Sequence, residues 1–238
     1  MSYGGVTIKN SDRFLTSFTR IEKELKDRIR NKRDLGFSRC VKILSKSDAV
    51  LKRYRDDLLE FAELRNAIVH NRIDADYTIA EPHLSVVEKI ETIELEIMQP
   101  KRVYPRFSKK VITFQETDSL ANVLQIIDEK EISRFPIYKD GKFKGLITER
   151  GITQWLAKNM RKNFPDGIET SLRDVLACQK NNTCRFIDKY TTVYEALEIF
   201  KNEIEKGSRI YMLLITENGN EGEQLLGIIT PRDIIDLV

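Results

Sequence analysis

The feature that most constrains this chain is a pattern of strands and helices that occurs twice between residues 107 and 238. Each copy is expected to hold a strand, a helix, two strands joined as a hairpin, and a last helix, in the order β-α-β-β-α. The threonines expected to cap the first helix of each copy, Thr117 and Thr191, are 74 residues apart, whereas Gly145 and Gly227 are 82 apart. A longer second hairpin loop accounts for the difference, so the sequence predicts a tandem duplication of one supersecondary unit.

Local signals place the elements of each copy. Asp140-Gly141 favours a tight hairpin turn in the first copy, and Pro231 in the second stands where a helix favours proline as its first residue. A loop rich in Gly and Asn, residues 217–224, makes the second hairpin longer. The expected strands are 111–114, 135–138 and 143–148 in the first copy, and 185–187, 211–216 and 225–230 in the second.

The first 98 residues follow a different pattern, in which apolar residues recur at helical spacing. One helix is expected to start at Asn10-Ser11-Asp12 and to end by Asp34-Leu35-Gly36. Short connections between amphipathic helices predict a small antiparallel bundle. The further helices are expected through Val41 and Leu44, from about residue 48 to 70, and from about 84 to 97, with a polar loop at 71–82.

Two prolines, Pro100 and Pro105, interrupt the helical pattern and mark the expected domain boundary, because proline removes a backbone donor and disfavours helix before it. The fold class is therefore expected to be α+β. We predict an all-α helical bundle in residues 1–98, a linker in 99–106 and the tandem β-α-β-β-α pair in 107–238, with its copies in 107–160 and 170–238.

Each copy carries a related heptad where its last strand runs into its last helix. It reads Gly145-Leu-Ile-Thr148-Glu-Arg-Gly151 in the first copy and Gly227-Ile-Ile-Thr230-Pro-Arg-Asp233 in the second. Within two such repeats, the heptad resembles the Gly-x-x-[Ser/Thr]-x-x-Asp signature of CBS domain pairs, also called Bateman modules. The resemblance covers residues 107–238 and implies a regulatory module that binds an adenine nucleotide such as AMP, ADP or ATP.

The residue types of the second heptad suit such a ligand. Glycine lets a strand backbone approach a ligand closely, a threonine hydroxyl can bond to a phosphate or ribose oxygen, and an aspartate one turn on can accept both ribose hydroxyls. By resemblance, Gly227, Thr230 and Asp233 form the site, with counterparts Gly145 and Thr148 in the first copy. Because Gly151 has no side chain to hold a ribose, one competent site per chain is expected. The alternative reading of Thr230 and Asp233 is ordinary helix capping.

In the helix expected from residue 48 to 70, Arg65 lies in the middle of the apolar stripe, about 20° from Leu58 at 100° per residue. An arginine in that position needs a partner, because desolvating a guanidinium costs several kcal/mol. The partner can be an acidic side chain, an oligomer interface or an anion. Asn66 and His70 share the flank of the stripe, within reach of Arg65.

The segment Leu64-Arg-Asn-x-x-x-His70 resembles the Arg-[polar]-x-x-x-His motif of HEPN domains, helical bundles of prokaryotic toxin, defence and RNA-processing proteins. The resemblance implies a homodimer whose paired motifs cleave RNA without a metal ion. Arg65 would stabilise the phosphorane charge, His70 would act as acid or base, and Asn66 would orient them. The alternative is a catalytically silent dimerisation or docking bundle, in which Arg65 pairs with an acid such as Glu94 or Glu96.

Charge, apolar runs and cysteine spacing exclude several classes of protein. The net charge of +3 is too near balance to indicate a nucleic-acid partner by itself. Residues Met1–Asn10 lack the apolar region of a signal peptide, and the longest apolar run, Tyr211–Ile215, is too short to cross a bilayer. The three cysteines match no zinc pattern. We therefore expect a cytoplasmic protein with no membrane contact and no metal ion. The resemblance to CBS domain pairs implies, in addition, that a bound nucleotide controls the helical bundle.

Overall fold

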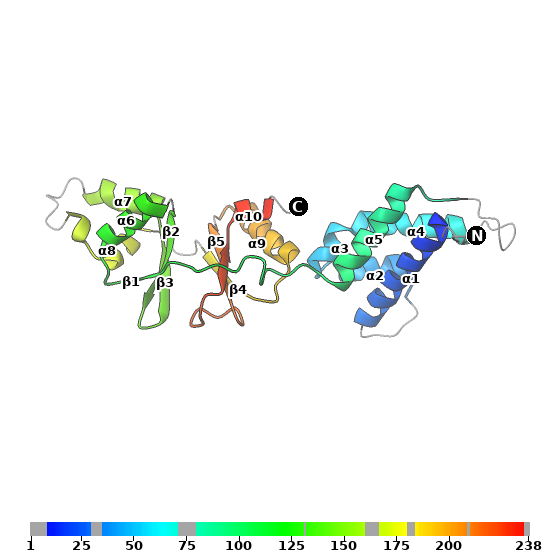
Figure 1. Ribbon diagram of the computed structural model, residues 1–238, viewed down its shortest axis with the longest axis horizontal. Helices are drawn as coiled ribbons and strands as arrows, with labels where there is room; N and C mark the ends of the chain where they lie inside the picture. Colours follow the sequence, from blue (N-terminus) through cyan, green and yellow to red (C-terminus); the bar gives the residue numbers. More distant parts are fainter. Residues whose placement is uncertain are drawn as a thin grey trace, which may run out of the picture. The chain divides into compact units, whose positions relative to one another are not determined.

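The chain folds as the α+β arrangement expected from its sequence, a helical region followed by two β-α-β-β-α repeats (Figure 1). The structure is a computed structural model that describes residues 9–29, 35–70, 80–130, 132–159, 167–179, 184–208 and 210–235; the side chains of residues 70 and 235 are not described. The chain divides into two compact units, Met1–Lys101 and Arg102–Val238.

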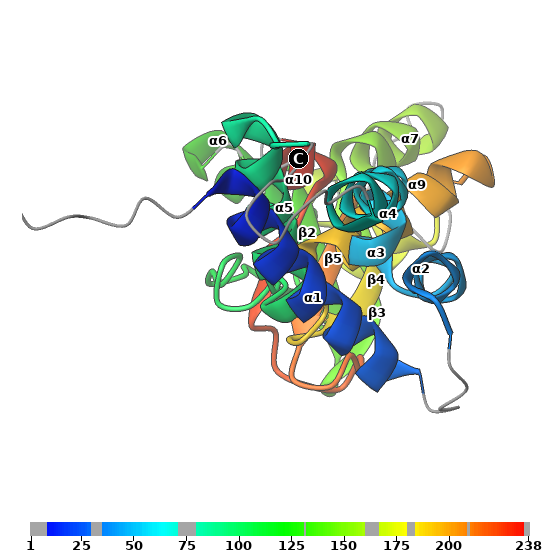
Figure 2. The same cartoon turned by 90° about the vertical axis from the view of Figure 1, so that its right-hand side faces the viewer.

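The first unit is built from helices packed around aromatic side chains. Its helix α1 lies against α2, α4 and α5 (Figure 2). The ring of Phe14 packs on those of Phe18 and Phe61, and Phe18 packs on Phe37. The expected apolar face of α1 is confirmed, since Phe14, Phe18, Ile21 and Leu25 are all buried. The helices are α1 (Asn10–Arg28), α2 (Phe37–Leu44), α3 (Ala49–Arg53), α4 (Arg55–His70) and α5 (Leu84–Met98).

The helix expected from residue 48 to 70 is in fact two helices. Tyr54 leaves helical geometry at φ −98° and ψ 14°, which separates α3 from α4. The Asp48 carboxylate caps α3 by accepting a hydrogen bond from the Leu51 N–H at 3.0 Å. A break of one residue does not disturb the apolar periodicity, so the sequence predicted a single helix. Most of the polar loop expected at 71–82, residues 71–79, lies outside the described residues.

The second unit contains two small sheets with the same topology. In each, the first strand pairs in parallel with the second, and the second pairs antiparallel with the third. The expected hairpin turn is confirmed, because Asp140 and Gly141 have φ of 48° and 75°. The strands are β1 (Phe114–Gln115), β2 (Arg134–Lys139), β3 (Lys142–Thr148), β4 (Cys184–Asp188), β5 (Met212–Thr216) and β6 (Gly227–Ile229).

Helices cover one face of each sheet (Figure 1). The short helix α8 was not expected from the sequence. The Thr192 hydroxyl and the Glu195 carboxylate form a reciprocal capping box at the start of α9. The helices are α6 (Leu120–Lys130), α7 (Glu149–Asn159) and α8 (Leu172–Leu176) in the first repeat, with a 3-10 turn at Gly167–Glu169, and α9 (Val193–Glu205) and α10 (Pro231–Ile235) in the second.

The two repeats exchange the segments that precede their first strands. Val103, upstream of β1, is fully buried in the core of the second repeat, and its N–H donates to the Thr191 carbonyl at 2.9 Å. Leu172 in α8, upstream of β4, is fully buried in the core of the first repeat, and its N–H donates to the Asp118 carbonyl at 2.9 Å. Each core therefore contains residues from outside its own contiguous repeat.

The other faces of the two sheets contact each other. Leu146 of β3 packs with Met212 and Leu214 of β5. The ring of Phe143 meets that of Phe186 edge to face, with centroids 5.1 Å apart. The two repeats thus share an apolar seam within one unit. Among the described residues, no helix combines the length and the apolar character needed to cross a membrane.

Candidate functional site

The second repeat brings Thr230 and Asp233 together at the end of its sheet where β6 stops and α10 begins. Thr230 follows β6, and Asp233 lies in the first turn of α10. The Thr230 N–H and hydroxyl both donate to the same carboxylate oxygen, Asp233 Oδ2, each at 2.7 Å. In the part of the chain that the structure describes, Asp233 Oδ1 has no hydrogen-bond partner. Both residues are half-buried, so one oxygen of a fixed carboxylate is left for another group.

In this structure the Thr230 hydroxyl makes its contact within the protein. The sequence suggested that the Thr230 hydroxyl bonds to a ligand, but here it donates to Asp233. The reason is local, because a threonine before a helix and an acid three residues later are within reach of each other. The hydroxyl holds the Asp233 carboxylate in place, and its oxygen lone pairs can still accept a hydrogen bond.

Gly227 is required by the chain's own backbone. A Cβ built on Gly227 would lie 2.1 Å from the Phe107 carbonyl oxygen and 3.2 Å from the Ser108 Cα. Ser108 forms an isolated antiparallel bridge with Gly227. The segment upstream of β1 therefore makes the close approach at this glycine.

In the first repeat, Gly145 and Thr148 are occupied by contacts within the protein. Gly145 has a φ of 154°, and a Cβ on it would lie 3.1 Å from Leu176 Cδ2. Thr148 is 6 % exposed, and its Oγ1 accepts the N–H of Gly151 at 3.1 Å. Thr148 is thus an ordinary N-cap of α7.

Two residues missed by the sequence reading lie at the same sheet edge as Thr230. Leu213 pairs with Ile229, so the next step of the antiparallel register brings Met212 opposite Thr230, with Tyr211 just beyond. Arg134, the first residue of β2, places its guanidinium carbon 5.6 Å from the centroid of the Tyr211 ring. No acidic partner of Arg134 is found within the described ranges. Arg134 of the first repeat thus contacts Tyr211, just before β5 of the second repeat.

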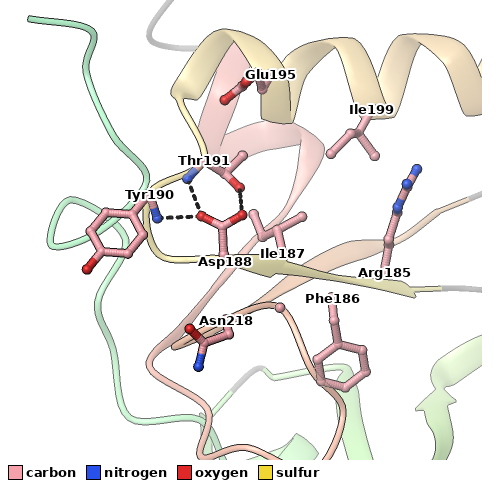
Figure 3. Close-up of a pocket in the computed structure, with 10 residues that line it drawn as sticks. Arg185, Phe186, Ile187, Asp188, Tyr190, Thr191, Glu195, Ile199 and Asn218 are labelled. Atoms are coloured by element: carbon pink, nitrogen blue, oxygen red, sulfur yellow. Dashed lines mark hydrogen bonds between the residues drawn. The ribbon is translucent and has the colours of Figure 1, made fainter.

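A pocket of about 620 Å³ lies at the opposite edge, where β4 and β5 end (Figure 3). The Asp188 carboxylate accepts the Tyr190 N–H at 2.7 Å, and it accepts the Thr191 N–H at 2.9 Å and the Thr191 hydroxyl at 3.2 Å. Asp188 therefore stabilises the turn from β4 into α9 with both of its carboxylate oxygens. None of the site residues predicted from the sequence lines this pocket.

Burial raises the pKa of two groups near the seam between the repeats. Burial, with smaller contributions from Cys184 and Glu221, raises the pKa of the Tyr138 phenol to about 12. Burial also raises the pKa of the Cys184 thiol to about 12. A thiol with such a pKa is a poor nucleophile and metal ligand at neutral pH.

In the first unit, two of the three motif residues of the helical domain are described. Arg65 is half-buried, and its Nη1 donates to the Oδ1 of the exposed Asn66 at 3.3 Å. His70 ends α4, and its side chain lies outside the description.

The suggested pairing of Arg65 with Glu94 or Glu96 is wrong. Glu94 binds Arg20 at 3.2 Å, and Glu96 binds Lys101 at 2.5 Å. The sequence could not separate these partners, because several basic residues of the first unit are within a side chain's length of α5.

Solved structures of low identity share part of this fold. A CBS domain containing membrane protein from Sphaerobacter thermophilus is 19 % identical, with 64 % of this chain and 98 % of that chain covered at a TM-score of 0.45. A CBS domain pair in complex with 5′-methylthioadenosine and S-adenosyl-L-methionine is 19 % identical, covering 58 % and 95 % at a TM-score of 0.41. CBSX2 in complex with AMP is 12 % identical, covering 58 % and 90 % at a TM-score of 0.39. No curated protein matches the chain.

The family match is the decisive comparison. The model of the CBS domain family matches residues 103–158 and 169–238, which together make up more than half of the 238 residues. The matched segments begin upstream of β1 and β4, and so include both exchanged segments and both heptads. On this evidence the chain belongs to the CBS domain family and carries a CBS pair in its carboxy-terminal part.

Proposed function

We propose that the second CBS repeat binds one adenine nucleotide per chain, with the Asp233 carboxylate holding the ribose. The observation that carries the proposal is the fixed carboxylate: two hydrogen bonds from Thr230 hold Oδ2, and Oδ1 has no partner among the described residues. A carboxylate accepts hydrogen bonds only, and a ribose diol supplies two donors. Because the carboxylate is already oriented, little side-chain entropy is lost on binding.

Arg134 is the proposed phosphate ligand. It stands over Tyr211 at the same sheet edge, and a guanidinium matches the geometry of phosphate oxygens. A site that combines a carboxylate for ribose and an arginine for phosphate selects nucleotides over nucleosides. The site therefore draws on both repeats, since Asp233 belongs to the second and Arg134 to the first.

Calorimetry of the full chain with AMP, ADP, ATP and S-adenosyl-L-methionine tests this proposal. We expect one nucleotide per chain, and we expect Asp233→Ala to weaken it. Loss of a charge-assisted hydrogen bond costs about 1.5–3 kcal/mol, or roughly tenfold to hundredfold in Kd. Asp188→Asn is the matched control, because Asp188 also turns a strand into a helix but lies at the opposite edge. Unchanged affinity in Asp233→Ala would rule the site out.

For the helical unit we propose nucleotide-controlled, metal-independent RNA cleavage by a homodimer. The supporting observation is that Arg65 and Asn66 are joined by a hydrogen bond on α4. Arg65 would neutralise phosphorane charge, and His70 would transfer the proton. The rival role for the same unit is dimerisation or partner docking without catalysis. Control by nucleotide requires two states of the protein that bind it with different affinity.

A further inference from the structure

In the first repeat, the side chain of Gln179 contacts the heptad threonine, Thr148. Gln179 lies just beyond α8, and its N–H donates to the Leu176 carbonyl at 2.9 Å. The Thr148 hydroxyl donates to Gln179 Oε1 at 3.2 Å. In the second repeat, the equivalent Thr230 hydroxyl donates to Asp233 Oδ2. The Gln179 carboxamide therefore does for Thr148 what the Asp233 carboxylate does for Thr230.

Gly151 provides the space that the Gln179 side chain fills. Gly151 is the counterpart of Asp233, three residues after the threonine. A Cβ on Gly151 would lie 2.0 Å from Gln179 Cδ, 2.3 Å from Nε2 and 2.4 Å from Oε1. Real Cβ atoms do not approach heavy atoms so closely, so no residue with a side chain fits at 151 while Gln179 stays in place. The missing carboxylate of the first repeat is thus matched by an amide from another element.

The amide is held in this position at a cost. Gln179 Nε2 is buried and has no hydrogen-bond partner among the described residues. An unsatisfied buried amide donor is unfavourable. The Gln179 side chain is therefore held beside Thr148 by one hydrogen bond and by its close packing over Gly151. It does not make a full set of hydrogen bonds.

Among the described residues of the second repeat, no side chain from the exchanged segment bonds to Thr230. Gly145 meets Leu176 and Gly227 meets Phe107, so the two exchanged segments correspond at these residues. Three residues further along are Gln179 in one segment and Lys110 in the other. Lys110 is exposed, and within the described ranges it makes no hydrogen bond to Thr230 or Asp233. Lys110 therefore does not take the place at Thr230 that Gln179 takes at Thr148.

We propose that Gly151 and Gln179 together limit this chain to one nucleotide site, because the glycine supplies no ribose-binding carboxylate and the Gln179 carboxamide fills the space where one would stand. The inference rests on the proposed function of the second repeat. Gly151 and Gln179 act as a pair, because the glycine leaves a space beside Thr148 and the Gln179 carboxamide fills it.

Thermal unfolding without nucleotide tests the pair directly. Gly151→Ala should be less favourable to the Tm in the full chain than in a Gln179→Ala background, because the new Cβ must displace the Gln179 carboxamide and break its bond to Thr148. The same substitution should have little effect or a stabilising one in a Gln179→Ala background, because alanine favours a helix over glycine. Equal effects of Gly151→Ala in both backgrounds would overturn the proposal. This double-mutant cycle needs no ligand, so it tests the Gly151–Gln179 contact even if the chain binds no nucleotide.

Calorimetry with AMP then tests the number of sites. The wild type and Gln179→Ala should bind one AMP per chain, and the double variant Gly151→Asp with Gln179→Ala should bind two. Adding Asp233→Ala to the double variant should leave one site, now in the first repeat. A wild type that binds two AMP, or a folded double variant that still binds one, would overturn the role of Gln179 while leaving the second-repeat site intact. No binding by the wild type would instead refute the proposed function.

Discussion

Thr148 and Thr230 occupy the same place in their repeats, and their neighbours decide what each can do. The Thr230–Asp233 pair could be predicted from the sequence, because a spacing of three residues at a strand-to-helix junction brings the side chains together. Gln179 could not be predicted, because it is 31 residues from the threonine that it contacts. Arg134 was missed for the same reason, since only the packing of two repeats brings it to Tyr211.

Arg134→Gln should distinguish phosphate binding from ribose binding. We expect this substitution to weaken AMP by roughly tenfold to hundredfold, the effect of losing one charge-assisted contact, and to leave adenosine almost unaffected. Competition between AMP and adenosine in a fluorescence assay measures both affinities. Equal losses for the two ligands would show that Arg134 supports the fold of the site and does not contact phosphate.

Glu223 should keep its charge in acid. Hydrogen bonds from Asn218 and Asn220 lower the pKa of this carboxyl to about 2. A pKa below that of the unfolded chain means that the carboxylate stabilises the loop above the unfolded value, and that this contribution is lost as pH falls through about 2. At roughly pH 3.5, below the usual glutamate pKa, NMR of the carboxyl carbon should still report the ionised form. A midpoint near the usual value would show that these hydrogen bonds are absent in solution.

At the scale of elements, periodicity and turn residues predicted most helices and strands. These local signals could not predict which distant segments pack together. The strand order of both hairpins and the helix that follows each heptad were foreseen. Helix α8 was missed because its five residues are too few to show a period. The exchange of segments could not be predicted from the sequence, because the apolar residues Val103 and Leu172 do not show by themselves which of the two cores they enter.

Leu172→Ala should destabilise the first repeat, although Leu172 lies downstream of all its strands. Leu172 is fully buried against that core, and such a truncation costs about 2–5 kcal/mol. Hydrogen exchange should show β2 and β3 losing more protection than β5. Ile204→Ala is the control, because Ile204 is 70 % exposed and should change stability by less than about 0.5 kcal/mol. Greater loss of protection in β5 than in β2 would contradict the exchange.

At the scale of the whole molecule, a CBS pair follows a helical unit for which we propose RNA cleavage. If the helical unit cleaves RNA, single-stranded RNA should be cut in EDTA and leave 2′,3′-cyclic phosphate ends. His70→Ala should reduce the rate by about 10²–10⁴ while the protein stays folded, and sedimentation should show a dimer. RNA that stays intact with and without AMP would favour a docking role, and cleavage that survives in His70→Ala would point to another nuclease.

A crystal structure of the full chain with AMP tests the central claim most directly. The account predicts one nucleotide per chain, with its ribose hydroxyls within hydrogen-bond distance of Asp233 Oδ1 and its phosphate on Arg134. The Gln179 amide should remain beside Thr148, with no nucleotide in the first repeat. A nucleotide bound away from Asp233, or one bound beside Thr148 with Gln179 displaced, would contradict it.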